Sequence, residues 1–285
     1  MKTLYLSDLD GTLLNNEGVL PERSRAALNR LIARGTQFSV ATARNTLSMY
    51  VLDGLRLHVP VSIMNGAVCY DTQKDEYFAA KPIDPDAFCR ITRILRKHSM
   101  TGFAYGVSPK VQSLYYEPPA HFRPPASQYY EKRLRDKLRA PQSVKLIQAE
   151  RLEDIAEECI CFFTVKETYE TLLAVRNEIQ VIDGIYAPVY KDKYTDYWFV
   201  EVASGSASKA AAVHDLRAWG AYDRVVGFGD DVNDIPMLKA CDEAYAVANA
   251  AEAVKALADG VIDSNEENGV ANYLEQQFKT GASNV

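Results

Sequence analysis

Short apolar runs that alternate with helical stretches are the feature that most limits how this chain can fold. The first third of its 285 residues contains, in order, "TLYL" (3–6), "PERSRAALNRLIARG" (21–35), "TQFSVAT" (36–42), a helical stretch to about Leu55, and "PVSIMNGAVCY" (60–70). The first, third and last of these are β-type, and the second carries its apolar residues on one helical face. Strand–helix–strand units with short links predict a parallel, doubly wound sheet.

The same alternation returns near the end of the chain, after a middle section of different texture. "SASKAAAVHDLRAWG" (206–220) predicts a helix and "DRVVGFG" (223–229) a strand, and a short helix, a strand and a helix follow. The middle section is rich in proline and tyrosine and ends in the strand-like "YWFVEVAS" (197–204). Whole domains can be inserted at exposed connections, so this pattern indicates an insertion in one α/β domain.

The resulting prediction is a core formed by residues 1–82 and 204–285, with an inserted domain at 83–203. The net charge of −6 and the pI of about 5.4 give no reason to expect nucleic acid or an anionic membrane as a partner. Between residues 86 and 151, however, thirteen Lys and Arg face five acids, a local balance of 13 − 5 = +8. That balance fits either an anionic ligand or a solvated helical face.

Cysteine and histidine usage makes a zinc site unlikely on spacing alone. The five cysteines include no C-x-x-C, and the four histidines are scattered. Only Cys159 and Cys161 are close, either as a soft-metal site or, as we favour, as two thiols on one face of a buried strand. The N-terminal apolar run is too short for a secretory signal and no stretch reaches membrane-spanning length, so we expect a cytoplasmic protein.

Polar clusters follow three of the apolar β-type runs. "TLYL" leads into Ser7-Asp8-Leu9-Asp10-Gly11-Thr12, "QFSVA" into Thr42-Ala43-Arg44, and "RVVGFG" into Asp230-Asp231-Val232-Asn233-Asp234. In an open parallel sheet, ligands bind beyond the carboxyl ends of the strands. If these strands are neighbours, all three clusters lie on one edge of the sheet.

The residue types in these clusters indicate a metal and a phosphate. Several carboxylates need a cation, and a set of oxygen ligands favours Mg²⁺ over zinc. Lys209, the Thr42 hydroxyl and helix N-termini are groups that bind a phosphate. A carboxylate beside both could serve as a nucleophile, and the three together describe phosphoryl transfer.

Each cluster also has a purely structural interpretation. Asp-Leu-Asp-Gly is common in surface turns, because Asp and Gly favour turn conformations. Thr42 could cap the following helix, Lys209 could be a solvated helix residue, and the 230–234 cluster could cap the helix at Ile235. Their joint occurrence after three strands favours the functional interpretation.

In these motifs the sequence resembles the haloacid dehalogenase-like (HAD) phosphatases, in particular the Cof-type subfamily IIB. "DLDGT" (8–12), Thr42 in "VATAR", Ser208-Lys209 and "GDDVNDIPML" (229–238) match that family's four motifs in order. The resemblance implies an α/β fold: a Rossmann-like parallel-sheet core with an inserted α/β (type C2) cap domain. It is weak over roughly 84–195, where caps diverge.

The resemblance also implies roles for individual residues. Asp8 would be the nucleophile that forms an aspartyl-phosphate, and Asp10 the group that protonates the leaving oxygen and later deprotonates water. Mg²⁺ would be bound by Asp8, by the backbone carbonyl of Asp10 and by Asp230, with Asp234 behind these ligands. The residues that would hold the transferring phosphoryl group are Thr42, Lys209 and Asn233.

The expected function is therefore that of a Mg²⁺-dependent phosphatase acting on a small phosphorylated metabolite. Sugar phosphates come first and phosphorylated cofactors second. Two alternatives remain: a phosphotransferase or phosphomutase that uses the same aspartyl-phosphate, and a non-catalytic sensor that binds the metabolite. The sequence assigns no cap residue to the substrate and leaves the oligomeric state open.

Overall fold

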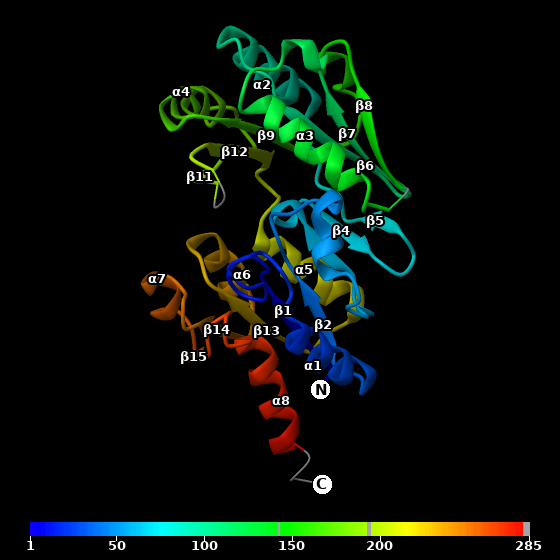
Figure 1. The fold of residues 1–285 in the computed structure, drawn as a ribbon, viewed down its shortest axis with the longest axis vertical. Coiled ribbons are helices and arrows are strands. Elements are labelled where there is room, and N and C mark those ends of the chain that lie inside the picture. Colours follow the sequence, from blue (N-terminus) through cyan, green and yellow to red (C-terminus); the bar gives the residue numbers. More distant parts are fainter. Residues whose placement is uncertain (142, 193–194, 282–285) are drawn as a thin grey trace. The chain divides into compact units, whose positions relative to one another are not determined.

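The structure is a computed structural model that describes residues 1–141, 143–192 and 195–281 (Figure 1). Its contacts group the chain into two compact units. The first contains Met1–Arg44, Met49–Lys74 and the chain from Ser208 onward, and the second contains Asn45–Ser48 and Asp75–Ala207. The domain boundaries at 82 and 203 stay a prediction.

The first unit is built on a parallel sheet with the strand order β15-β14-β13-β1-β2 (Figure 1). Its strands are β1 (Thr3–Ser7), β2 (Gln37–Val40), β13 (Arg224–Gly229), β14 (Glu243–Val247) and β15 (Gly260–Ile262). β1 is central and pairs in parallel with β2 and β13, with Leu6 opposite Ser39 on one side and Gly227 on the other. The predicted parallel α/β core is thus present, with the two sequence segments joined in one sheet.

Helices accompany this sheet, as the sequence pattern predicts. They are α1 (Glu22–Ala33), α5 (Lys209–Gly220), α6 (Ile235–Ala240), α7 (Glu252–Lys255) and α8 (Gly269–Gly281). The apolar face of α1, formed by Ala27, Leu28, Leu31 and Ile32, is buried. Burial of such a face supplies most of a helix's stability in a protein.

The segment after β2 departs from the predicted regular elements. The helical stretch near Leu55 is a 3₁₀ helix, η1 (Thr46–Leu52), and the strand predicted over 60–70 is wrong as one element. It is divided into β3 (Val61–Ile63), the 3₁₀ turn η2 (Met64–Gly66) and β4 (Val68–Asp71), and β4 runs antiparallel to β3. The cause is a run of three residues with positive φ, Met64 at +52°, Asn65 at +55° and Gly66 at +86°, which reverse the chain.

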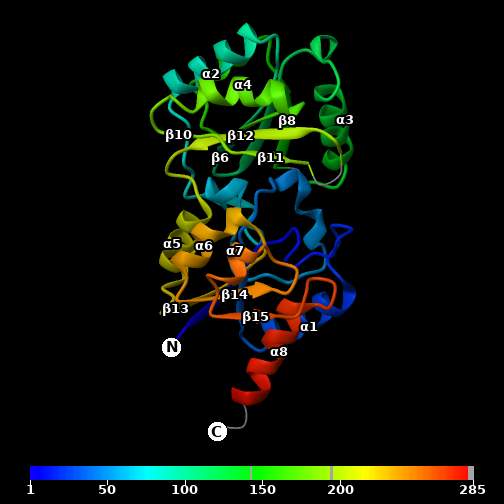
Figure 2. The same cartoon turned by 90° about the vertical axis from the view of Figure 1, so that its left-hand side faces the viewer.

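The second unit contains a mixed sheet with the order β10-β12-β9-β6-β7-β8, and β11 pairs with β12. Figure 2 labels β6, β8, β10, β11 and β12 of this sheet. Its strands are β6 (Phe103–Ser108), β7 (Val111–Tyr116), β8 (Val144–Gln148), β9 (Ile160–Glu167), β10 (Ile185–Tyr186), β11 (Val189–Lys191) and β12 (Trp198–Ser204); the short β5 (Glu76–Phe78) precedes them. β7 and β8 are parallel, and the other strand pairs described in this sheet are antiparallel. A mixed sheet of this kind agrees with the predicted α/β cap.

Helices α2 (Pro85–Lys97) and α4 (Tyr169–Ile179) share one apolar core with this sheet, in which Phe88 packs edge-on against Phe163. Helix α3 (Ala126–Lys137) instead joins an aromatic cluster in which Tyr129 lies 4.7 Å from Phe103 and 5.9 Å from Phe199 between ring centroids. The short 3₁₀ helices η3 (Pro119–His121) and η4 (Leu152–Ile155) complete this unit. Within the described residues, no helix is long and apolar enough to cross a membrane.

In the first unit, a close backbone approach fixes the start of α5. The Ser208 hydroxyl accepts a hydrogen bond from the Ala211 amide at 3.0 Å and so caps the helix. Gly66 packs against the Ser208 carbonyl so closely that a Cβ at residue 66 would overlap it. Glycine at this position therefore lets the η2 turn support the first turn of α5, which carries Lys209.

We expect Gly66→Ala to destabilise the protein more than Gly35→Ala, which serves as its matched control. Both glycines have positive φ, +86° and +97°, but nothing lies within 4 Å of a Cβ placed on Gly35. Gly35→Ala should cost about 1–2 kcal/mol from the backbone conformation alone. Overlap with Ser208 should add about 1–3 kcal/mol. Urea unfolding of the two variants measures the difference, and equal losses would contradict the close approach.

Candidate active site

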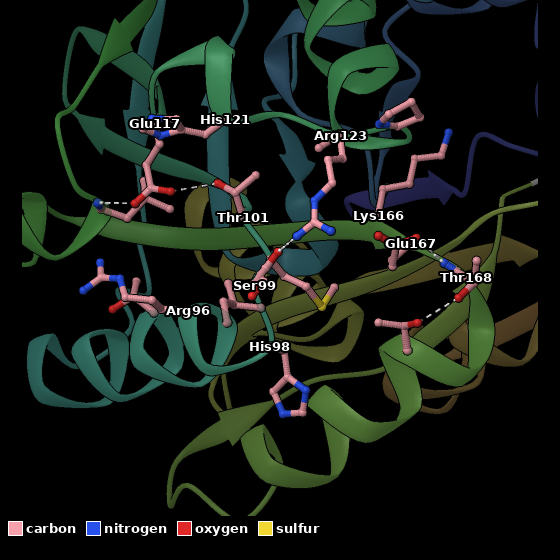
Figure 3. Close-up of a pocket in the computed structure, with 17 residues that line it drawn as sticks. Arg96, His98, Ser99, Thr101, Glu117, His121, Arg123, Lys166, Glu167 and Thr168 are labelled. Carbon is pink, nitrogen blue, oxygen red and sulfur yellow. Dashed lines mark hydrogen bonds between the residues drawn. The ribbon is translucent and has the colours of Figure 1, made fainter.

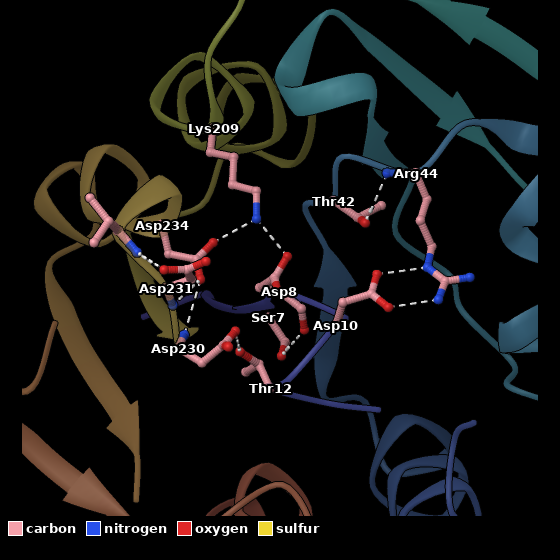
Figure 4. A network of polar contacts seen from close by, with 11 residues as sticks. Ser7, Asp8, Asp10, Thr12, Thr42, Arg44, Lys209, Asp230, Asp231 and Asp234 are labelled. Atoms are coloured by element: carbon pink, nitrogen blue, oxygen red, sulfur yellow. Dashed lines mark hydrogen bonds and ion pairs between the residues drawn. The ribbon is translucent and has the colours of Figure 1, made fainter. Parts of the chain in front are cut away.

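The three predicted polar clusters lie at the carboxyl ends of neighbouring strands (Figure 4). Asp8 follows β1, Thr42 follows β2 and Asp230 follows β13. Ladder hydrogen bonds run past the strand ends, from the Asp8 amide to the Phe228 carbonyl and from the Ala41 amide to the Ser7 carbonyl, both 2.9 Å. The topology therefore brings residues more than 180 positions apart to one edge of the sheet.

Lys209 joins two carboxylates at the centre of this site. Its Nζ lies 2.5 Å from Asp8 Oδ1 and 2.5 Å from Asp234 Oδ1, and the side chain is only 2% exposed (Figure 4). Burial alone would lower the pKa of Lys209, but the charges and hydrogen bonds of Asp234 and Asp8 raise it. The lysine is therefore a fixed positive charge beside Asp8.

The surroundings of Asp8 disfavour its ionised form. Burial, the Asp234 carboxylate and the Asp230 carboxylate raise the pKa of Asp8 well above its ordinary value, against the opposing effect of Lys209. A raised pKa in the folded state means that folding disfavours the ionised carboxylate at neutral pH. A further cation beside Asp8 would relieve that cost.

Three carboxylates provide a place for such a cation. Each of Asp8, Asp230 and Asp234 offers one oxygen, and these oxygens lie within 4.8 Å of one another. Oxygen-only donors suit Mg²⁺, which takes few protein carboxylates and keeps several waters. The donor set thus fits the predicted ion, in a cluster that includes Asp234 in addition to the predicted Asp8 and Asp230.

Asp234 also shapes the loop that carries Asp230. Its Oδ2 accepts hydrogen bonds from the backbone amides of Asp230 at 3.0 Å and Asp231 at 3.1 Å, while its Oδ1 faces Lys209. Asp231 in turn caps the short 3₁₀ helix η5 (Val232–Asp234). The cluster therefore caps η5 and not, as the structural interpretation had it, the helix at Ile235, whose N-cap Asp234 makes no side-chain capping hydrogen bond.

Two residues of the first motif hold the Asp230 carboxylate from the other side. The Thr12 hydroxyl donates a hydrogen bond to Asp230 Oδ1 at 2.8 Å. Gly11 has φ +91°, and a Cβ on it would overlap the same carboxylate. The Gly-Thr pair is thus required by the approach of Asp230. Sequence reasoning noted the pair but gave neither residue a role.

Asp10 leaves β1 two residues after Asp8, and its carboxylate points to a different partner. Arg44 binds it in a bidentate pair, with Nε 2.7 Å from Oδ2 and the terminal nitrogen 2.6 Å from Oδ1 (Figure 4). This pair separates Asp10 from the Lys209 network. Sequence reasoning missed Arg44, although it stands in the polar cluster after β2, two residues beyond Thr42.

Thr42 is buried where two loops meet. Its amide donates to the Ser62 carbonyl and its carbonyl accepts from the Asn65 amide, both at 3.0 Å, while its hydroxyl accepts from the Arg44 amide at 3.1 Å. Asn233, the remaining predicted phosphate ligand, is exposed in η5 and makes no side-chain hydrogen bond in the described part of the chain. The structure therefore fixes Thr42 and leaves the Asn233 amide open to solvent.

The second unit has a cavity of about 570 Å³ that contains none of the predicted site residues (Figure 3). It lies among the end of α2, the start of α4 and the loop after β7, where Arg123 donates to the Ser99 carbonyl at 2.8 Å. Glu117 and Glu167 lie in the same lining as its basic side chains. The local positive balance of this segment is thus partly offset at the cavity.

The chain was compared with known protein families, curated proteins and solved structures. The model of the haloacid dehalogenase-like hydrolases matches residues 5–274, so the chain belongs to that family. Pyridoxal phosphate phosphatase YbhA of Escherichia coli K12 is 26% identical over 94% of this chain and 95% of its own. 5-Amino-6-(5-phospho-D-ribitylamino)uracil phosphatase YitU of Bacillus subtilis 168 is 24% identical over 96% and 97%.

Solved structures agree on the fold. That of the HAD subclass IIB sugar phosphatase BT4131 superposes with a TM-score of 0.71 at 21% identity, covering 97% of this chain and 98% of the other. The protein is thus a HAD-like phosphatase and a phosphoric monoester hydrolase, and its fold is that of the subclass IIB structure. The resemblance inferred from the motifs is confirmed at this level.

We expect Mg²⁺ to raise the unfolding temperature of the wild type, and Asp230→Asn to lose most of that shift. Binding only to the folded state stabilises it by about 2.7 kcal/mol at a hundredfold excess over the dissociation constant. The matched control is Asp231→Asn, the exposed neighbour, which should keep the full shift. Differential scanning fluorimetry with Mg²⁺ and with chelator measures this. Equal shifts in both variants would contradict a metal site at Asp230.

Proposed function

We propose that the protein is a Mg²⁺-dependent phosphatase that hydrolyses a small phosphorylated metabolite through an aspartyl-phosphate on Asp8. The observation that carries this proposal is the buried Asp8 carboxylate, held 2.5 Å from Lys209 inside a three-carboxylate cluster. A carboxylate that served only structure would gain nothing from two further carboxylates at its side.

The residues of the site divide the work of the reaction. Asp8 attacks phosphorus, and the leaving oxygen takes a proton from Asp10. Asp10 then takes a proton from the water that attacks the aspartyl-phosphate, and inorganic phosphate leaves. Lys209, Thr42 and Asn233 hold the phosphoryl oxygens. When bound by Asp8, the Asp10 carbonyl and Asp230, Mg²⁺ supplies positive charge that offsets repulsion between the anionic ester and the nucleophile.

Lys209 has a double function in this scheme. It orients the Asp8 carboxylate in the resting site, and its charge stabilises the equatorial oxygens that gain charge in the transition state. Because Asp234 holds the ammonium at 2.5 Å, the lysine needs no rearrangement to act. Preorganised charge of this kind is worth more in a buried site than in water.

For the substrate, we propose a sugar phosphate first and a phosphorylated cofactor second. A sugar phosphatase among the structural neighbours supports the first, and the pyridoxal phosphate phosphatase relative supports the second. Phosphate release from a panel of both classes, with Mg²⁺ and with chelator, tests the order. Transfer of the phosphoryl group to a sugar hydroxyl without release of phosphate would favour the phosphomutase alternative.

We expect Asp8→Asn to abolish phosphate release while the protein stays folded. The amide keeps the shape of the side chain but is a far weaker nucleophile, and loss of a covalent nucleophile costs several orders of magnitude in turnover. The matched control is Asp231→Asn, which should keep wild-type turnover. Phosphate release and circular dichroism on both variants measure this. Wild-type turnover in Asp8→Asn would refute the mechanism and favour a different nucleophile.

We expect Arg44→Met to slow alkyl phosphates much more than an aryl phosphate. Arg44 positions the Asp10 carboxylate through two hydrogen bonds, and general acid catalysis by a positioned group is worth about 10²–10⁴-fold. An aryl leaving group departs with little protonation, so turnover of an aryl phosphate should change little when general acid catalysis is lost. Steady-state kinetics on a sugar phosphate and on p-nitrophenyl phosphate measure the ratio, with Asp10→Asn as the reference. An equal decrease on both substrates would contradict a positioning role.

A further inference from the structure

A pair of thiols in the second unit lies outside everything that the proposed reaction uses. Cys159 Sγ and Cys161 Sγ are 3.8 Å apart. The favoured interpretation from sequence, two thiols on one face of a strand, is only half right, because β9 begins at Ile160. Cys161 lies in that strand and is fully buried, whereas Cys159 precedes it and is partly exposed.

The backbone around Cys159 is bent rather than extended. The Ile160 amide donates to the Glu158 carbonyl at 2.7 Å, which closes a three-residue turn centred on Cys159. The Val107 amide binds the Cys159 carbonyl at 3.0 Å, and the pairing of β6 with β9 shifts register at this point. The bend turns two side chains of sequence spacing two toward each other.

We propose that Cys159 and Cys161 form a redox-active dithiol, which a low-molecular-weight disulfide such as glutathione disulfide converts into an intramolecular disulfide. The sulfurs must approach by roughly 2 Å to reach bonding distance, a movement within the range of side-chain rotation. Among the described residues, neither Cys89 nor Cys241 lies against another cysteine sulfur.

The two thiols differ in pKa and in exposure, and thiol–disulfide exchange needs one accessible thiolate and one resolving thiol. The hydrogen bond between the two thiols lowers the pKa of Cys159 to about 7, so this thiol has substantial thiolate character at neutral pH. The same hydrogen bond, followed by burial, raises the pKa of Cys161. Cys159 is thus the accessible attacking group, and Cys161 is the protected group that resolves the product.

The exchange balances in two steps. The Cys159 thiolate attacks one sulfur of glutathione disulfide, the disulfide bond breaks, and one glutathione leaves as a thiolate that takes a proton. Cys161 then loses its proton, attacks the Cys159 sulfur and expels the second glutathione. Two protein thiols are oxidised, and one small disulfide is reduced to two thiols.

The test is thiol counting on the full-length wild type after incubation with glutathione disulfide, acid quenching and alkylation. We expect alkylatable thiols to fall from five to three, with the loss confined to one peptide that contains Cys159 and Cys161 and is lighter by two hydrogen atoms. A dithiol reductant should restore all five. Alkylation of both cysteines after treatment, or a lasting glutathione adduct on Cys159, would overturn the proposal.

Two variants separate the roles of the pair. Cys161→Ser should stop the reaction at a stable Cys159–glutathione adduct, because the resolving thiol is gone. Cys89→Ser is the matched control, since Cys89 is also partly exposed but isolated, and it should form the intramolecular disulfide as the wild type does. Mass spectrometry of intact protein and peptides reads both results. Formation of the two-hydrogen-lighter peptide is independent of phosphatase activity, so it stands or fails apart from the proposed function.

Discussion

The ion pairs of Lys209 with Asp8 and Asp234 are the interaction on which the site depends. All three side chains are buried, and an unpaired charge in such a place costs several kcal/mol. One ammonium serves two carboxylates, so the group of three carries a net negative charge whenever both carboxylates are ionised. Together with Asp230 nearby, that imbalance makes the site ready for a divalent cation and, through it, for an anionic ester.

The surrounding backbone is arranged to make that cluster possible. Gly66 lets the η2 turn reach the carbonyl of Ser208, which starts the helix that carries Lys209. Gly11 lets the loop after β1 reach the carboxylate of Asp230. In both places glycine lets two backbone segments or a backbone and a side chain come close, because it has no Cβ. Glycine also adopts the positive φ that both positions require. Glycine thus determines where the charges of the site lie.

Much of this arrangement could be predicted from the sequence, because strand ends in a parallel sheet are easy to recognise and their polar residues must share one edge. Asp8 and Asp230 lie at one edge of the sheet for that reason, and Lys209 reaches them from the first turn of α5. The division of 60–70 into a hairpin was missed because apolar residues flank Asn65 and Gly66 on both sides, although an Asn-Gly pair between two apolar runs is itself a turn signal. The ion pair between Arg44 and Asp10 was not predicted either. A bidentate pair depends on the direction of the side chains, which sequence spacing does not encode.

The roles of the site residues and the domain boundaries remain predictions, since neither the family match nor the fold tests them. Asn233 shows why. The motif assigns it to the phosphoryl group, yet its amide is exposed and its direction is not fixed by any hydrogen bond of the described chain. A ligand would have to supply the contact that orients it.

The central position of β1 has a consequence for synthesis of the chain on the ribosome. β1 is made first, but its partner β13 begins only at Arg224, after the entire second unit has been translated. Until then one edge of β1 exposes unpaired amides and carbonyls next to the buried residues Leu4 and Leu6. The nascent chain therefore carries an open sheet edge for most of its translation, and protection of that edge is a task for chaperones or for the speed of elongation.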